Sequence, residues 1–164
     1  MLFRSYRFEP GTPGFITAFS PSPKEGELPT ATSISVTYGE RPGNQANITI
    51  SFPTHPSVVD ANSPISVMGT GSGLFESNVV VHALDWEGTV IAEAVTILDA
   101  AEPGGEGSWS VELSVRVDTP TPGLIVAFSP SATNDIPDAY DGVGVIYNVL
   151  CAHSTRRAKF WQSK

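Results

Sequence analysis

Residues 121–131 read TPGLIVAFSPS, and residues 12–22 read TPGFITAFSPS. The stretch from Leu124 to Phe128 is apolar throughout and of strand length, which is typical of a central strand that is covered on both faces. Each proline in the preceding Thr-Pro-Thr-Pro-Gly segment lacks an N–H donor, so we expect the connection into the strand there. These letters predict a β-protein, and their repetition predicts two copies of one strand and its turn.

The two copies are 109 residues apart, and the same offset aligns residues 5–9 with 114–118 and residues 33–38 with 142–147. This period exceeds the roughly 20–50 residues of solenoid repeats and suits an immunoglobulin-like domain of ~100 residues. Met1 aligns with Ser110, so the first copy would begin in the middle of a domain. We therefore expect the C-terminal part of a first repeat at 1–39, a linker at 40–46 and a complete domain at 47–149.

Alternation of apolar and polar residues predicts the strands of the complete domain. It is clearest over residues 109–118, where every second residue from Trp109 to Val117 is apolar. Residues 89–98 contain Ala and Glu, but their β-branched residues and flanking turn residues favour a strand over a helix. Strands are expected at 47–52, 63–71, 76–85, 89–98, 109–118, 124–129 and 143–149, with loops at 102–108 and 130–142.

About seven strands without a convincing helix predict an all-β fold. The expected architecture is an immunoglobulin-like antiparallel β-sandwich, preceded by a partial repeat of the same fold. Its predicted core contains Ile48, Val81, Trp109, Val111, Leu113, Val126, Phe128 and Val145. The partial repeat would have strands at 2–9, 14–20 and 33–38, with Phe15, Phe19, Ile34, Val36 and Tyr38 as core residues.

Charge is distributed unevenly along the chain, whose formal net charge is −8. All of the acidic residues precede residue 149, and an acidic body repels phosphate backbones, so no nucleic-acid partner is expected. Residues 150–164 form a basic tail, which we expect to be solvated and poorly ordered. Cys151 is the single cysteine, which excludes an intrachain disulfide. No apolar stretch is long enough to span a membrane.

No group of residues predicts catalysis. His55, His82 and His153 fall on different predicted elements, and His82 lies among valines as a satisfied strand residue. Glu76 has no second carboxylate beside it, whereas glycosidases need a pair, so we expect it to accept backbone hydrogen bonds at a strand start. Residues 69–73, Gly-Thr-Gly-Ser-Gly, lack the lysine and helix of a phosphate loop and are interpreted as a turn. We expect no enzyme activity, no catalytic residue and no cofactor.

Asp135, Asp138 and Asp141 place three carboxylates in one predicted loop, and Ca²⁺ prefers oxygen ligands of this kind. Their spacing is three residues rather than two, and the first copy has only Glu25 and Glu27 in the corresponding stretch. Solvated turn residues are therefore the favoured interpretation, with a calcium site as the alternative. No metal ligand is assigned.

An ordered set of motifs resembles the bacterial spore-germination immunoglobulin-like domain family. The set consists of a Gly-x-Gly turn at Gly69 and Gly71, a Phe-Glu pair at Phe75 and Glu76, an Asp-x-x-Gly hairpin at Asp85 and Gly88, a strand start at Gly107 and Trp109, and a serine-rich loop at Ser129 and Ser131. The resemblance covers about residues 47–148, and its later part covers residues 1–38 again. It implies an accessory module of bacterial envelope and spore proteins, found in tandem or beside a second germination-associated domain.

Two functions remain open. The first is a non-catalytic adhesion or scaffold module of a cell-envelope or secreted protein, associated with spores or germination, with cell-wall polymer or another envelope protein as its partner. The second is a carbohydrate-binding accessory module of a secreted enzyme, which requires Trp86, Tyr140 and a neighbouring aromatic residue to form one exposed flat patch. The expected location is extracellular or in the cell envelope. The truncated first repeat is expected to self-associate through its uncovered apolar face.

Overall fold

The structure, a computed structural model, describes residues 12–20, 30–38, 46–132 and 137–149. These residues form strands and one short 3₁₀ turn, and they contain no α-helix. The elements are β1 (Thr12–Ser20), β2 (Thr30–Tyr38), β3 (Asn47–Phe52), β4 (Ser57–Asp60), β5 (Ile65–Ser72), η1 (Phe75–Ser77), β6 (Asn78–Asp85), β7 (Val90–Ile97), β8 (Asp99–Ala100), β9 (Gly107–Leu113), β10 (Thr121–Ser129) and β11 (Ala139–Asn148). None of the described helices is long and apolar enough to cross a membrane.

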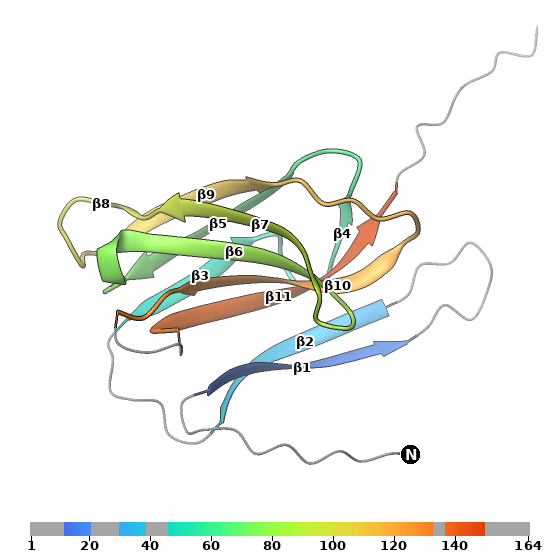
Figure 1. Ribbon diagram of the computed structural model, residues 1–164, viewed down its shortest axis with the longest axis horizontal. Helices are drawn as coiled ribbons and strands as arrows, with labels where there is room; N and C mark the ends of the chain where they lie inside the picture. The colour runs from blue at the N-terminus through green and yellow to red at the C-terminus, as the bar shows by residue number, and fades with distance from the viewer. Residues whose placement is uncertain (1–11, 21–29, 39–45, 133–136, 150–164) are drawn as a thin grey trace, which may run out of the picture.

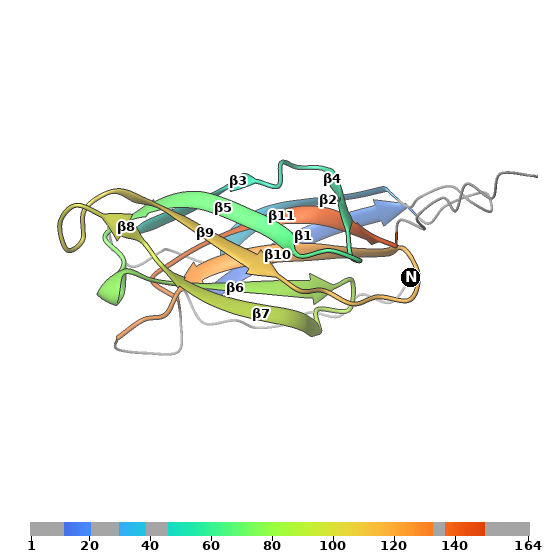
Figure 2. The ribbon, with the colours of Figure 1, turned by 90° about the horizontal axis from the view of Figure 1, so that it is seen from above.

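Strands β3 to β11 form two sheets that pack face to face as a β-sandwich (Figures 1 and 2). One sheet has the order β3-β5-β9-β8, and the other has the order β4-β11-β10-β6-β7. The predicted all-β sandwich is confirmed. The expectation of purely antiparallel pairing is wrong for β4, which runs parallel to β11 and which the sequence analysis did not predict as a strand.

Trp109 occupies the centre of the sandwich because β5 has glycine opposite it. Trp109 pairs with Gly69 across β9 and β5, and a Cβ atom on Gly69 would lie 2.5 Å from the indole ring and 1.9 Å from the carbonyl oxygen of Thr49. The indole N–H donates to the carbonyl oxygen of Thr70 at 3.1 Å. The predicted turn at 69–73 is therefore wrong, since Gly69 and Gly71 lie inside β5 and admit bulky neighbours to the core.

Most of the predicted core residues point between the two sheets. Ile48, Val81, Trp109, Leu113 and Val145 are buried there, and Val111 is partly buried against them.

Val126 is buried as predicted, but neither it nor Phe128 belongs to the core between the two sheets. They alternate along β10 with the core residues Ile125 and Ala127, so they lie on the opposite face of the sheet. A wholly apolar run carries no alternation from which the inward face could be read.

Several strand boundaries also differ from the prediction. β10 begins at Thr121, so the last three residues of the predicted connection lie inside the strand, where Pro122 pairs with Ile146. β11 begins at Ala139, so part of the predicted loop at 130–142 is strand, because tight pairing with β10 continues to Ser129. β9 ends at Leu113, although Val115 beyond it remains buried. Residues 89–98 contain β7 as predicted, with no helix.

Strands β1 and β2 form a separate hairpin, which lies on the outer face of the five-stranded sheet and makes a third layer (Figures 1 and 2). The hydroxyl of Tyr140 in β11 donates to the carbonyl oxygen of Val36 in β2 at 2.6 Å. The Phe15 ring meets the Tyr140 ring edge to face, with centroids 6.0 Å apart, and fills the space above Gly142. The hairpin thus covers the face of β10 and β11 that points away from the core.

The two hairpins have the same pairing register. Every residue pair of β1–β2 becomes a pair of β10–β11 when 109 is added to both numbers, as Thr12–Tyr38 and Thr121–Tyr147 illustrate. Phe15 and Ile34, however, lie on opposite faces of the first hairpin, because Ile34 pairs with Ile16. The prediction that both residues belong to one core face is therefore wrong.

Several predictions fall outside the described residues. They concern the strand at 2–9, nearly all of the linker at 40–46, the basic tail at 150–164, and the side chains of Phe19 and Tyr38.

Replacing Trp109 by Ala should lower the free energy of unfolding by about 3–5 kcal/mol, because a buried aromatic side chain is removed and Gly69, which faces it, has no side chain to fill the space. Chemical denaturation would measure the change. Phe75→Ala is the matched control, since Phe75 is an exposed aromatic residue and its truncation should change stability by no more than about 0.5 kcal/mol. Equal effects of the two substitutions would contradict the core assignment.

We expect the folded protein to lose stability in alkali because of Tyr147. Its ring is fully buried against Gly123, its hydroxyl donates to the carbonyl oxygen of Leu124 at 2.9 Å, and burial raises the pKa of Tyr147 far above its ordinary value. Above about pH 10 only the unfolded chain releases this proton, so the free energy of unfolding should fall by up to about 1.4 kcal/mol per pH unit from this residue. Denaturation between pH 8 and pH 12 should show a shallower slope for Tyr147→Phe; an unchanged slope would contradict the burial of the hydroxyl.

Candidate functional site

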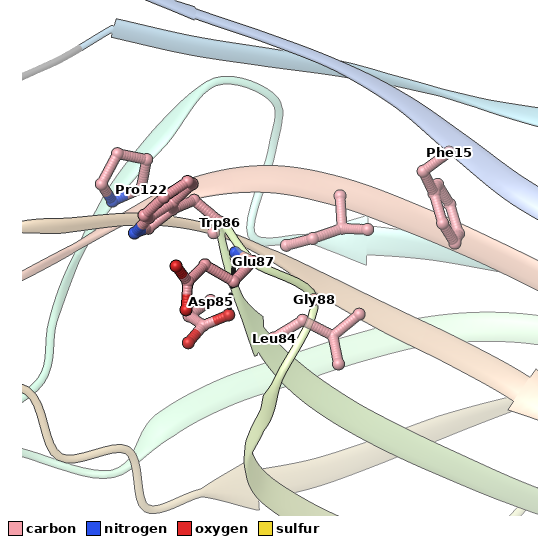
Figure 3. A pocket seen from close by; sticks show the side chains of 9 residues that line it. Phe15, Leu84, Asp85, Trp86, Glu87, Gly88 and Pro122 are labelled. Atoms are coloured by element: carbon pink, nitrogen blue, oxygen red, sulfur yellow. Dashed lines mark hydrogen bonds between the residues drawn. The ribbon is translucent and has the colours of Figure 1, made fainter. Parts of the chain in front are cut away.

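A hollow lined by exposed and partly buried aromatic residues lies at the turn between β6 and β7. Its volume is about 340 Å³, and it is lined by Phe15, Leu84, Asp85, Trp86, Glu87, Gly88, Pro122, Gly123 and Leu124. Figure 3 shows Trp86 beside Pro122 at one end, while Phe15 reaches in from the β1–β2 hairpin at the other. Two parts of the molecule therefore form the hollow: the β6–β7 turn of the sandwich and the β1–β2 hairpin.

Asp85 determines the shape of the turn. Its Oδ1 atom accepts hydrogen bonds from the backbone N–H groups of Glu87, at 2.9 Å, and Thr89, at 2.8 Å. Gly88 adopts a φ of 85°, which glycine tolerates without steric cost, and its N–H donates to the carbonyl oxygen of Asp85 at 3.0 Å. The Asp-Trp-Glu-Gly turn predicted from the sequence is thus present, and its backbone is held by several hydrogen bonds.

Trp86 is presented to solvent by this turn. It is 56% exposed, which is unusual for an indole with so much apolar surface. Leu84 and Leu124 give the hollow beside it an apolar lining, and Asp85 and Glu87 also line it. The site can therefore receive an apolar group and favours a positively charged neighbour to that group.

Tyr140 does not contribute to an exposed patch with Trp86. It pairs with Phe128 at one end of β10, whereas Trp86 follows the β6 residue that pairs with Gly123 near the other end. Its hydroxyl is bonded to β2 and its ring packs against Phe15. The flat patch required for the carbohydrate-binding interpretation is therefore absent from the described residues.

The two described histidines, His55 and His82, do not come together. His82 lies in the middle of β6 opposite Glu93 of β7, with 3.0 Å between Nε2 and Oε2, and its ring meets the ring of Phe128 edge to face at 5.0 Å. This agrees with a satisfied strand residue. His55 lies in the exposed connection between β3 and β4, and His153 is outside the described residues.

Glu76 lies in the turn that precedes β6 rather than in a strand. Its backbone has a φ of 51°, and its carboxylate accepts a hydrogen bond from the side-chain amide of Asn78 at 3.4 Å. The expected backbone donors are replaced by a neighbouring side chain.

The three candidate calcium ligands have different surroundings. Asp135 is outside the described residues. Asp141 lies in β11, where its Oδ2 atom accepts a hydrogen bond from the backbone N–H of Ile50 at 2.8 Å and so joins the two sheets at one edge of the sandwich. Asp138 donates its backbone N–H to Ser129. Across the described parts of the chain, no three acidic, histidine or cysteine side chains are grouped to hold a metal ion.

Sequence reasoning identified Trp86 and its turn but not the hollow beside them. Phe15 is separated from Trp86 by most of the first hairpin and by β3 to β6, and nothing in their spacing indicates that they share a surface. The 109-residue offset could have indicated this contact. It predicts that β1–β2 is a fragment of a sheet, and such a fragment needs to pack against another surface.

A family model described as the immunoglobulin-like domain of bacterial spore germination matches residues 47–135. A comparison with curated proteins finds no match to the chain. The matched region begins with β3 and extends past β10, so it contains most of both sheets of the sandwich. It covers more than half of the chain's 164 residues and contains all of the motifs from which the resemblance was recognised. The chain belongs to the family of immunoglobulin-like domains of bacterial spore germination.

Proposed function

We propose that this chain is a non-catalytic interaction module, with an adhesion or scaffold role in a bacterial cell-envelope or secreted protein that is associated with spore germination. The observation that carries this proposal is the exposed Trp86 on a hydrogen-bonded turn beside an apolar hollow. Family membership supports the link to spore germination. An extracellular or envelope location is part of the same proposal.

The chemistry of the hollow favours a protein partner. An exposed tryptophan on a fixed backbone loses little conformational entropy on binding and offers a large contact area, which is why tryptophan is enriched among the residues that dominate protein interfaces. Leu84 and Leu124 provide an apolar surface for a side chain of the partner, and Asp85 and Glu87 favour lysine or arginine around it. We infer another envelope protein with an apolar residue and basic neighbours.

The carbohydrate-binding alternative has weaker support. Sugar rings stack on flat, exposed aromatic faces, and one tryptophan offers a single such face. Tyr140, the second aromatic residue that the hypothesis required, uses its hydroxyl and its ring to hold the β1–β2 hairpin. Cell-wall polymer therefore ranks below an envelope protein as the partner.

Replacing Trp86 by Ala should reduce binding to a solubilised envelope-protein fraction at least about tenfold, since loss of a dominant interface residue costs 2 kcal/mol or more. Surface plasmon resonance with the immobilised full chain would measure this, with purified cell-wall polymer as a second ligand. Phe75→Ala is the matched control because it truncates another exposed aromatic residue, at the opposite end of β6.

Full retention of protein binding by Trp86→Ala would contradict the proposed contact site. Trp86-dependent binding to the polymer alone would favour the carbohydrate-binding function. Release of sugar ends or peptide fragments from the polymer by the intact chain would contradict the non-catalytic role.

A further inference from the structure

The β1–β2 hairpin has a free edge whose counterpart is paired in the sandwich. β10 lies between two neighbours: it pairs with β11 on one side, and its residues from Gly123 to Phe128 pair with β6 on the other. β1 differs from β10 only at Phe15 and Thr17 and pairs with β2 in the same register. Among the described residues β1 has no neighbour in the position that β6 takes beside β10.

The face of the hairpin that points away from the sandwich carries apolar residues whose counterparts in β10 and β11 are buried. The 109-residue offset places Ile16 on Ile125, which is fully buried, and Ile34 on Val143, which is 6% exposed. Ile16 and Ile34 form a cross-strand pair and are 57% and 59% exposed. A residue pair with the pattern of a sandwich core is therefore open to solvent beside an unpaired strand edge.

The electrostatic surroundings favour a second copy of the same chain as the partner. β1 and β2 contain no charged residue, whereas the whole chain has a net charge of −8, so the two strands themselves add no like-charge repulsion when two molecules meet there. Edge strands of soluble proteins are commonly protected by charged side chains, and β1 has none. By contrast, the edge strands β4, β7 and β8 carry Asp60, Glu93 and Asp99.

The edge strand β3 is also uncharged, but its environment differs from that of β1. The backbone N–H of Ile50 in β3 is already bonded to Asp141 of the opposite sheet. Part of this edge is therefore occupied by a contact within the molecule. Among the strands that the structure describes, the hairpin is the uncharged element that has both an open edge and an apolar exposed face.

We propose that two copies of this chain associate through antiparallel pairing of their β1 strands about a twofold axis. The result is a four-stranded sheet with the order β2-β1-β1-β2, in which backbone N–H and C=O groups of both edges are satisfied. Ile16 of one copy lies next to Ile16 of the other, and Ile34 extends the row on each side. The same row in the sandwich is Val143, Ile125, Ala83 and Ala92, across β11, β10, β6 and β7.

The association should be weak and reversible. Pairing of two nine-residue strands should bury less than the roughly 1,200 Å² of a standard protein interface, a size typical of transient complexes, so we expect the dimer to dissociate in the micromolar range. Trp86 is not part of the proposed β1–β1 contact. A Trp86→Ala variant that no longer binds an envelope protein should therefore still form the dimer. The two proposals can fail independently.

Sedimentation velocity of the full chain between about 1 and 500 µM tests the proposal. We expect the wild type to change from monomer to dimer over this range and Ile16→Lys to remain a monomer throughout, because the lysine places a charge on each side of the twofold axis. Val95→Lys is the matched control: Val95 is equally exposed, on the edge strand β7, and its substitution should leave the dimer unchanged. Thermal denaturation of both variants checks that each is folded.

Hydrogen exchange supplies a second measurement. The amides of residues 12–20 should become more protected as the wild-type concentration rises, and this dependence should be absent in Ile16→Lys. A wild type that stays monomeric at all concentrations would overturn the proposal, and so would dimerisation that Val95→Lys abolishes and Ile16→Lys retains.

Discussion

Burial of β10 on both faces is the constraint on which the rest of this structure depends. Ile125 and Ala127 point into the sandwich, and Leu124 and Val126 are buried on the opposite face. A strand with two apolar faces requires a layer on each side. The sheet β3-β5-β9-β8 provides one layer, and the β1–β2 hairpin provides the other over β10 and its neighbour β11. The three-layer arrangement of Figure 1 follows from this requirement.

The hairpin can serve as a layer because β11 makes room for it. Gly142 leaves space for the ring of Phe15, and Tyr140 donates a hydrogen bond to the backbone of β2. On the opposite side of the same strand, Asp141 accepts a hydrogen bond from β3 and holds the edge of the sandwich closed. Alternate residues of one short segment therefore fasten the strand to both of its neighbouring layers. The aspartates and the glycine of this segment have the composition of a turn, which predicts a loop. These contacts could therefore not be expected from the sequence.

The sequence predicted the class of fold, the seven main strands and most of the core, because alternation in β9 and turn residues at the strand ends are local signals. Prediction from the sequence was wrong where the structure depends on contacts between residues that are distant along the chain. Val126 and Phe128 belong to a uniformly apolar run, and only the position of the neighbouring strands determines which of its residues point inward. β4 and β8 are too short for a clear pattern, and their pairing depends on strands that are distant in the sequence. For the site, Trp86 and its turn were predicted from four consecutive residues, but Phe15 required knowledge of how the hairpin docks.

The two hairpins show that similar strands with one pairing register can have opposite exposure. β1 and β10 are nearly identical, yet Ile16 is exposed and Ile125 is buried. Local sequence therefore determines the hairpin and its register, while burial is determined by which strands are available to pair and to pack. For β10 these strands are β6 and the opposite sheet, which lie within the same domain. For β1 the outward face and the free edge have no such neighbours among the described residues, and the hydrophobic free energy that stabilises β10 remains available for association with another surface. In an acidic protein, an uncharged strand of this kind can meet its own counterpart without like-charge repulsion between the two strands.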